Sequence, residues 1–308
     1  MRALIVDPAG HSKIRFGEAP VPVQGPGQVL IEVLNSSLNA AELRFAGLSE
    51  PGAVPGFDAA GIVVAAAADG SGPAVGSRVV SFAEGGGWAE LRAVDSADVA
   101  VVPDSVDLAV AATLPVAAGT AMRAVWQAGP IAGRRVLVTG ASGGVGSFAV
   151  QLAAIGGAHV IASVGSRTSG TGLAELGAAE VVLGLDGVAE PVDVIIDMVG
   201  GPQLVEAYAL LASGGNVQSV GWASGQAALF PAGSTLGRKD PTSITSVFNG
   251  GGITDRQQQL KVLLKLVAEG RLRAAIGWHG SWERFAEAAD ALTGRTLRGK
   301  AVFDVPAR

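Results

Sequence analysis

The chain has 308 residues, 49% of them hydrophobic, so it holds enough apolar material for two domains of ordinary size. A formal net charge of −5 argues against a nucleic-acid partner, because such binding depends on clustered Lys and Arg, and the absence of cysteine excludes disulfides, thiolate chemistry and Cys-based zinc sites. The longest nearly continuous apolar stretch, residues 59–68, is too short to cross a bilayer, and the composition as a whole predicts a cytoplasmic protein.

Residues 1–105 show short runs of β-branched residues separated by Gly and Pro. The first ten residues, MRALIVDPAG, are predicted to form a strand, because Asp7 and Pro8 interrupt the apolar run before a secretory signal could form. Further runs lie at 28–38, 61–68, 78–82 and 88–94, with turn-rich segments such as PVPVQGPG and AEGGG between them. Short strands with frequent turns predict an antiparallel or barrel-like β domain.

After Pro115 apolar strands alternate with helical segments. The segments are 135–139, 146–156, 159–163, 173–177, 181–183, 193–197, 202–212 and 216–221. This alternation predicts βαβ units, a doubly wound parallel sheet and therefore an α/β fold. A helix over 255–270, with Leu260, Leu263 and Val267 at helical spacing, is followed by a helix over 281–292 and a closing strand over 299–305.

A glycine-rich turn, TGASGGVG at 139–146, joins an apolar strand to a helix. Ala141, Gly143 and Gly146 occupy the three fingerprint positions of a dinucleotide-binding turn. Small residues let the backbone approach a pyrophosphate, while free N–H groups at the helix start face the anion. The predicted contacts are Ala141, Ser142, Gly143, Gly144, Val145 and Gly146.

Two enzyme layouts use such a turn. Short-chain dehydrogenases place it near the amino terminus and use a Tyr-x-x-x-Lys pair, but the only tyrosine here, Tyr208, is followed four positions later by Ala212. The chain instead resembles the medium-chain dehydrogenase/reductase superfamily, in particular its quinone oxidoreductase and enoyl reductase branch. The resemblance runs through PGFDAAGIV (55–63), VGSRVVSF (75–82), GGGWAELRAV (85–94), TLPVAAGTA (113–121), GASGGVGSFAVQLA (140–153), DVIIDMVGG (193–201) and RGKAVFDV (298–305).

The resemblance implies a GroES-like β-rich catalytic domain and a Rossmann cofactor domain. The expected boundaries are 1–115 with 275–308 for the first and 116–274 for the second. A homodimer is expected from the family alone. Where zinc-dependent members carry metal ligands, this chain has Asn39, Phe57 and either Pro115 or Val116. The three histidines show no ligand spacing, so the sequence predicts no metal site.

The cofactor is predicted to be NADPH. An NAD site holds an acid about 20 residues after the glycine turn, and none lies between His159 and Gly172. Ser163, Ser166 and Arg167 suit a 2′-phosphate instead. The resemblance implies further cofactor contacts from Thr120, Val199, Gly200, Gly201, Gly221, Val247, Phe248, Asn249 and Lys300. Packing or turn formation is an equally good interpretation of Phe248 and Lys300.

A substrate pocket is expected between the two domains. Its predicted lining is Asn39, Leu43, Arg44, Phe45, Phe57, Trp88, Trp222 and Phe248, although Phe45 and Phe57 fit a plain core role equally well. Asp58 is expected to be a hydrogen-bond anchor. The segment between Asn39 and Gly47 is one residue shorter than in related sequences and lacks the tyrosine of some enoyl reductases, which weakens any transfer of substrate from the family.

The predicted reaction is hydride transfer from NADPH to a quinone or to a carbon–carbon double bond conjugated to a carbonyl. Such a substrate develops an enolate that a few hydrogen-bond donors can stabilise, and Asn39, Arg44 or a cofactor hydroxyl are the candidate donors. A simple ketone develops a full alkoxide, for which zinc or a Tyr–Lys pair is the usual partner. Two alternatives stay open: an NADPH-binding protein without turnover, and a zinc-free ketone or alcohol oxidoreductase.

Overall fold

The computed structural model describes residues 1–236 and 239–307, and the chain divides into two compact units. Unit 1 comprises Met1–Gly119 and Gly250–Arg308, and unit 2 comprises Thr120–Asn249. The expected boundary at 275 differs from this division, because the helix α6 (Arg256–Ala268) packs against β7 (Val99–Val101) and the 3-10 turn η1 (Ser96–Asp98) of unit 1. The Arg256 guanidinium, fully buried, pairs with Asp98 at 2.8 Å.

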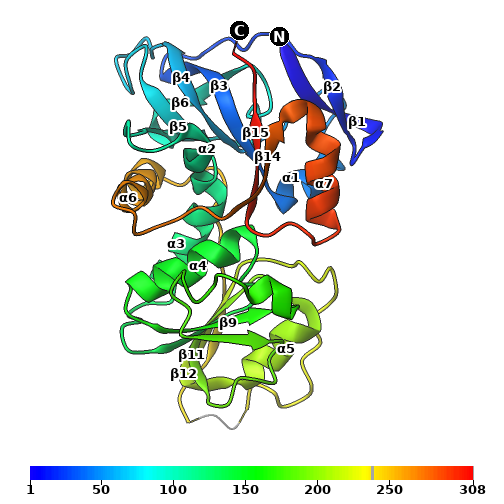
Figure 1. Cartoon of the computed structure of the whole chain (residues 1–308), viewed down its shortest axis with the longest axis vertical. Helices are drawn as coiled ribbons and strands as arrows, with labels where there is room; N and C mark the ends of the chain where they lie inside the picture. The colour runs from blue at the N-terminus through cyan, green and yellow to red at the C-terminus, as the bar shows by residue number, and fades with distance from the viewer. Residues whose placement is uncertain (237–238, 308) are drawn as a thin grey trace. The chain divides into compact units, whose positions relative to one another are not determined.

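Unit 1 is built on a mostly antiparallel sheet of seven strands. The order is β14-β15-β3-β4-β5-β7, with β6 also paired to β3, and a separate hairpin joins β1 to β2. The bounds are β1 Arg2–His11, β2 Ile14–Glu18, β3 Gln28–Leu38, β4 Asp58–Ala65, β5 Arg78–Phe82, β6 Leu91–Asp95, β14 Ile276–Ser281 and β15 Lys300–Asp304. The last strand, β15, pairs with β3 so that Ala301 faces Leu38, which brings the two ends of the sequence together (Figure 1).

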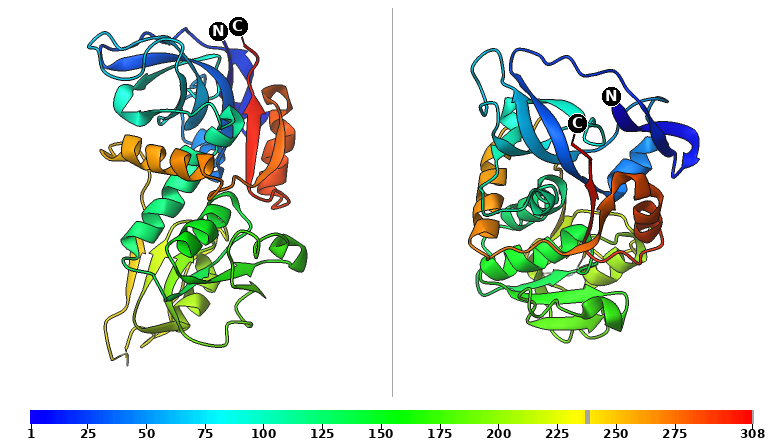
Figure 2. Two further views of the ribbon diagram at one scale, coloured as in Figure 1. Left: turned by 60° about the vertical axis from the view of Figure 1, so that its left-hand side comes forward. Right: turned by 45° about the horizontal axis from the view of Figure 1, so that its top comes forward.

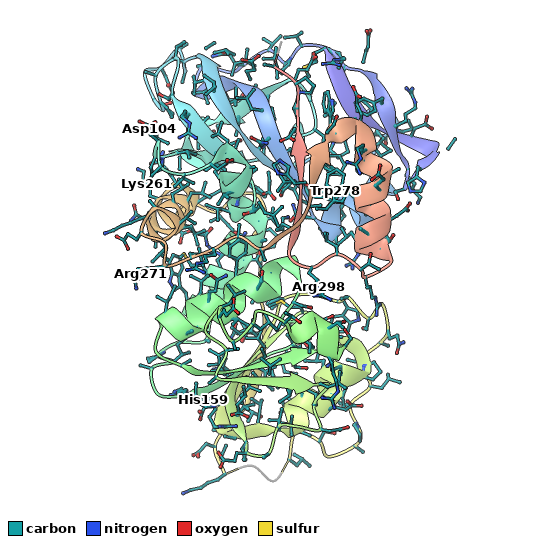
Figure 3. The ribbon with its side chains drawn as sticks, in the orientation of Figure 1. Asp104, His159, Lys261, Arg271, Trp278 and Arg298 are labelled. Carbon is teal, nitrogen blue, oxygen red and sulfur yellow. The ribbon has the colours of Figure 1, made fainter. Side chains whose placement is uncertain are left out.

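Helices and aromatic side chains close the core of unit 1. The helices are α1 (Ala40–Ala46), α2 (Leu108–Ala111), the π-helical turn η2 (Leu114–Ala118) and α7 (Phe285–Thr293), which follows the 3-10 turn η4 (Trp282–Arg284). Both views of Figure 2 show α7 beside β15, and Phe285 and Phe303 from these elements pack on Trp88 with ring centroids 5.3 and 6.0 Å away. Trp278 on β14, labelled in Figure 3, forms a T-shaped pair with Phe303, the ring centroids 5.7 Å apart.

Unit 2 is a six-stranded parallel sheet in the order β10-β9-β8-β11-β12-β13. The strands are β8 Arg135–Val138, β9 His159–Val164, β10 Glu180–Leu183, β11 Val192–Asp197, β12 Leu211–Ser219 and β13 Ser243–Ser246, and the helices are α3 Gly119–Gln127, α4 Gly144–Ile155 and α5 Gly201–Ala209. The chain proceeds outward from β8 in one direction and then from β11 in the other. This order is that of a doubly wound nucleotide-binding sheet, and it confirms the predicted α/β fold.

Two local predictions were wrong, and one strand was not predicted. Residues 173–177, which follow the 3-10 turn η3 (Arg167–Gly170), form turns rather than a helix. Gly172 and Gly177 both have positive φ, and the four residues between them are too few to nucleate a helix. The helix expected over 202–212 ends at Ala209. The edge strand β13 was not predicted, because its residues, SITS, are mostly polar and all exposed. Within residues 1–236 and 239–307, no helix has both the length and the apolar character that a membrane crossing requires.

Candidate functional site

The glycine turn of unit 2 is held in a tight geometry by its glycines. Gly140 has φ +59°, and a Cβ on Gly146 would lie 2.2 Å from the Gly140 carbonyl oxygen and 2.8 Å from the Ala141 Cα. Gly143 is the N-cap of α4 and offers no capping side chain. The backbone of the turn therefore stays uncovered at the start of the helix.

This turn fits a pyrophosphate. Ser142, Gly143, Gly144 and Val145 are all partly exposed, whereas Ala141 is buried and donates its N–H to the Ser163 carbonyl at 3.1 Å. The N-terminus of the 12-residue helix α4 carries free N–H groups and the positive end of the helix dipole. An anion of the cofactor would bind at this end.

The neighbouring strand end is organised by Asp197, which the sequence analysis did not single out. Its carboxylate is fully buried, accepts the Thr139 hydroxyl at 2.5 Å and accepts the backbone N–H of Gly200 at 2.8 Å. The Thr139 hydroxyl oxygen in turn accepts the N–H of Met198 at 3.1 Å. Asp197 thus fixes residues 198–200, which follow β11. The order of the strands reverses between the neighbouring strands β8 and β11, and sheets of this kind bind ligands at that point. In the sequence, the acidic residue at the end of the apolar segment 193–197 could have drawn attention to this position.

Other expected cofactor residues lie along the same edge of the sheet. Gly221 follows β12, and a Cβ there would meet the Met198 carbonyl oxygen at 2.7 Å, so the close approach requires glycine. The Asn249 amide donates to the Thr120 hydroxyl at 3.2 Å. Phe248 is 63% exposed. The remaining cofactor residues, Val199, Gly200, Gly201 and Val247, lie on the segments that follow β11 and β13, and Trp222, predicted for the substrate pocket, lies on the segment that follows β12.

Of the three residues predicted to bind a 2′-phosphate at the end of β9, one is buried and two are exposed. Ser163 is fully buried and donates its hydroxyl to the Gly184 carbonyl at 2.7 Å, so it does not face a ligand as expected. Ser166 is exposed and caps η3 by accepting the N–H of Ser169 at 3.2 Å. Arg167 is exposed and makes no hydrogen bond or ion pair with another residue of the described chain. Its guanidinium is free for an anion.

Unit 1 carries a buried polar cluster around Asn39, the N-cap of α1. The Asn39 amide donates through Nδ2 to Asp58 Oδ2 at 2.8 Å and accepts through Oδ1 from Lys300 Nζ. The Lys300 ammonium also donates to the Leu38 carbonyl at 2.8 Å and lies 3.7 Å from Asp58. Asn39, Asp58 and Lys300 are 8%, 0% and 3% exposed. The lysine expected at the cofactor is therefore part of an internal network of unit 1.

Asp58 is the anchor of this cluster. Besides the Asn39 amide, its carboxylate accepts the Ser37 hydroxyl at 2.7 Å and the Val116 N–H at 2.9 Å. These bonds connect β3, β4, α1 and η2 through one carboxylate. This is the arrangement of the hydrogen-bond anchor that the sequence analysis expected.

Two further charged groups border the cluster. Glu42 accepts the N–H groups of Asn39 and Phe57 at 2.7 and 2.6 Å, and burial, helped by nearby Asp58, raises the pKa of Glu42 to about 8. Burial lowers the pKa of Arg92 to about 10, although its guanidinium holds several carbonyl oxygens, that of Phe57 among them at 2.8 Å. Burial also lowers the pKa of Lys300, against the opposing charge of Asp58.

A hollow in unit 1 lies next to the cluster. Seven of its ten lining residues are apolar, and the lining is Val6, Glu42, Phe45, Ala46, Ser49, Ala53, Val54, Pro55, Phe57 and Glu84. Phe45 is 49% exposed, and the centroid of its ring lies 6.3 Å from that of Phe57 in a T-shaped arrangement. Two predicted pocket residues, Phe45 and Phe57, therefore line one hollow within unit 1.

The other predicted pocket residues of unit 1 lie elsewhere. Trp88 is 1% exposed in the hydrophobic core and donates its indole N–H to the Ser37 carbonyl at 3.3 Å, so it does not line a pocket as expected. Leu43 packs against the same core. Arg44 is exposed in the last turn of α1 and has no polar partner within the described residues. Asn39 is thus the one predicted donor that the fold holds rigidly.

Comparisons with known proteins agree with this arrangement. The model of the alcohol dehydrogenase GroES-like domain matches residues 25–104, and that of the zinc-binding dehydrogenase family matches residues 176–303. Quinone oxidoreductase of Mus musculus is 30% identical over an alignment of 335 positions that covers 98% of this chain and 97% of that protein. The chain belongs to the medium-chain dehydrogenase/reductase superfamily. The predicted resemblance is confirmed.

Two further members of this superfamily resemble the chain. Prostaglandin reductase-3 of Mus musculus is 30% identical over an alignment of 281 positions that covers 83% of this chain and 73% of that protein. The structure of the quinone oxidoreductase from Coxiella burnetii matches with a TM-score of 0.86 at 26% identity and covers 99% of each chain.

The second family model is named for zinc, but in the described residues the positions that the resemblance matches to metal ligands do not offer a fitting donor set. The Asn39 amide is engaged on both edges, Phe57 has no donor atom, and Val116 offers only a backbone N–H that already binds Asp58. Among residues 1–236 and 239–307, no three His, Cys, Asp or Glu side chains gather as a metal site would require. Each histidine instead pairs with a carboxylate: His11 with Asp290, His159 with Glu180 and His279 with Asp304.

Proposed function

We propose that this chain is a zinc-free, NADPH-dependent oxidoreductase that reduces a carbon–carbon double bond conjugated to a carbonyl, or a quinone. The observation that carries the proposal is the buried Asn39 amide, which Asp58 and Lys300 hold in a fixed orientation. The family resemblance matches Asn39 to the position of a metal ligand in zinc-dependent members. Relatives over most of the chain are named a quinone oxidoreductase and a prostaglandin reductase, which supports a reductase of this kind.

The donor set suits an enolate better than an alkoxide. Reduction of an enone at its β-carbon moves the π electrons of the double bond onto the carbonyl oxygen, and the charge is shared with the α-carbon before water protonates it. One oriented N–H from Asn39 stabilises such a delocalised charge. A saturated ketone concentrates a full charge on oxygen, and unit 1 offers neither a zinc ligand set nor a Tyr–Lys pair in its described residues.

NADPH, when bound, supplies the hydride. The glycine turn would hold its pyrophosphate at the N-terminus of α4, and the free guanidinium of Arg167, with the hydroxyl of Ser166, would bind the 2′-phosphate. The hollow beside Phe45 and Phe57 would receive the apolar part of the substrate. The exposed guanidinium of Arg44, in the last turn of α1, is the second candidate donor to the substrate.

Isotope transfer tests the reaction. The purified protein is incubated with 4-deuterated NADPH and, separately, with an α,β-unsaturated ketone, an enoyl thioester, a saturated ketone and a quinone. Deuterium at the β-carbon of the reduced ketone or thioester is the expected result, and NADPH-dependent quinone reduction is the alternative supporting result. Deuterated carbinols from the saturated ketone alone would refute the proposal in favour of a ketone or alcohol oxidoreductase. Tight NADPH binding with no oxidation by any acceptor would favour a binding protein without turnover.

A further inference from the structure

The two polar edges of the Asn39 amide face groups of opposite hydrogen-bonding capacity. Lys300 has an ammonium that only donates, and it faces Oδ1. Asp58 has a carboxylate that only accepts when ionised, and it faces Nδ2 at 2.8 Å. Turning the amide by 180° would set donor against donor and acceptor against acceptor in a site where all three side chains are at most 8% exposed. Only one orientation of the amide is therefore stable.

In this orientation the amide nitrogen keeps a second N–H, for which residues 1–236 and 239–307 offer no acceptor. The amide nitrogen has two N–H groups, and the bond to Asp58 uses one of them. The Asn39 backbone is fixed as well, because its N–H donates to Glu42 at 2.7 Å. The Lys300 charge on Oδ1 polarises the amide and strengthens its remaining N–H as a donor.

We propose that Lys300 and Asp58 are positioning residues that hold the Asn39 amide as an oriented donor for the carbonyl oxygen of the substrate. The inference rests on the proposed function. It also assigns Lys300 a role different from the cofactor contact that the sequence analysis expected. The Lys300 ammonium contacts the Leu38 carbonyl, the Asn39 amide and the Asp58 carboxylate. Lys300 therefore affects the reaction by orienting Asn39 and not by binding NADPH.

A double-mutant cycle tests this dependence. Asn39→Ala, Lys300→Met and the double variant are compared with the parent for kcat, for KM of the enone and for the Kd of NADPH by fluorescence. Asn39→Ala is expected to lower kcat roughly 10²-fold, as loss of one preorganised donor does. Lys300→Met is expected to lower kcat about 10-fold in the parent and less than about 2-fold in the Asn39→Ala background, since coupled residues are not additive. The Kd of NADPH is expected to stay within about 2-fold in every variant, far below the tenfold change that about 1.4 kcal/mol represents.

Two controls keep folding separate from positioning. Lys300→Met leaves the buried Asp58 carboxylate without its cation, so Lys300→Met with Asp58→Asn restores charge balance, and thermal unfolding of each variant is measured. Lys261→Met is the matched lysine control, because Lys261, labelled in Figure 3, is exposed on α6 and has Gln257 as its one hydrogen-bond partner among the described residues. It is expected to leave kcat, Kd and melting unchanged.

A readout without turnover separates this inference from the proposed function. In a ¹⁵N-labelled sample, the side-chain NH₂ resonances of Asn39, assigned by their loss in Asn39→Ala, are expected to be well separated in the parent. They are expected to move together in Lys300→Met and in the charge-balanced double variant. Unchanged amide resonances, multiplicative losses of kcat, or a rise of about 10-fold or more in the NADPH Kd of Lys300→Met would each overturn the inference. A resonance shift in a protein that reduces no conjugated acceptor would support the positioning role and reject the proposed reaction.

Discussion

Replacing Gly146 with alanine tests whether the glycine turn is as tightly built as the structure indicates. The added Cβ would lie 2.2 Å from the Gly140 carbonyl oxygen, about 1.2 Å short of the 3.4 Å at which ordinary contact begins. The two next nearest atoms, 2.8 and 3.0 Å away, are the backbone Cα and carbonyl carbon of Ala141. Because no flexible side chain can move aside, α4 must shift away from the end of β8.

The expected cost follows from this displacement. Overpacking of a well-packed site costs about 1–3 kcal/mol, and a clash with backbone on all sides belongs at the upper end, near 3 kcal/mol. At roughly 2–4 °C per kcal/mol, the melting temperature of the Gly146→Ala protein is expected to fall by roughly 6–12 °C. Displacing α4 also moves the N–H groups of the turn, so NADPH binding is expected to weaken by about 10-fold or more, or at least about 1.4 kcal/mol.

Differential scanning fluorimetry and NADPH fluorescence titration measure the two effects. Gly165→Ala is the control for stability, because a Cβ there meets no atom within 4 Å and the backbone φ is ordinary. Gly143→Ala is a graded case, since its Cβ would lie 3.3 Å from the Gly140 oxygen and a shift of tenths of an ångström relieves it. If Gly146→Ala melted within about 2 °C of the parent and bound NADPH equally well, the close packing of this turn would be refuted.

Four other predictions concern the cofactor, the metal and two buried acids. Arg167→Ala is expected to raise the KM of NADPH about 10-fold and leave that of NADH unchanged, and equal use of both cofactors by the parent would contradict it. Metal analysis of the purified protein is expected to find substoichiometric zinc, and activity lost on chelation and restored by zinc would disprove this. Asp197→Ala strands the Thr139 hydroxyl and the Gly200 N–H, so urea unfolding is expected to show a loss of about 2–4 kcal/mol. Burial raises the pKa of Glu42 from its ordinary value of 4.5 to about 8, so between these values the folded chain keeps a proton that the unfolded chain releases. Stability is therefore expected to fall as pH rises across that interval, and Glu42→Gln should flatten the slope in urea titrations at several pH values.

Much of the fold could be predicted from the sequence, because it depends on local signals. The strand at 135–139, the glycine turn and the helix that follows gave the parallel sheet and its nucleotide site, since periodicity and turn chemistry are written in neighbouring residues. The edge strand β13 was missed because it buries no residue and carries no apolar pattern. Helix α6 was assigned to the cofactor domain because its partner, Asp98, lies more than 150 positions earlier in the chain.

The candidate site was predicted less completely, because side-chain partners across the fold have no local signature. Asn39 stood out by its position, but the lysine that faces it lies 261 residues away and was expected at the cofactor. Ser163 was predicted to bind a 2′-phosphate at the end of β9, but the chain after β10 brings the Gly184 carbonyl to 2.7 Å from the Ser163 hydroxyl. Trp88 seemed a pocket aromatic, yet Phe285 and Phe303 enclose it. In each case a distant segment decided whether a polar or aromatic group faces a ligand or the interior.

The pairing of the first and last parts of unit 1 has a consequence for the chemistry. Strand β15 aligns Ala301 with Leu38, and this register sets the neighbouring Lys300 against the Leu38 carbonyl and the Asn39 amide. A shift of the register by one residue would turn the Lys300 side chain to the opposite face of the sheet and leave Asp58 buried without its cation. Hydrophobic side chains specify the register, because Ala301 and Phe303 of β15 are buried in the same core as Trp88. The apolar packing of β15 therefore determines which way the Asn39 amide faces, and with it, under the proposed function, whether unit 1 presents a donor or an acceptor to a carbonyl oxygen.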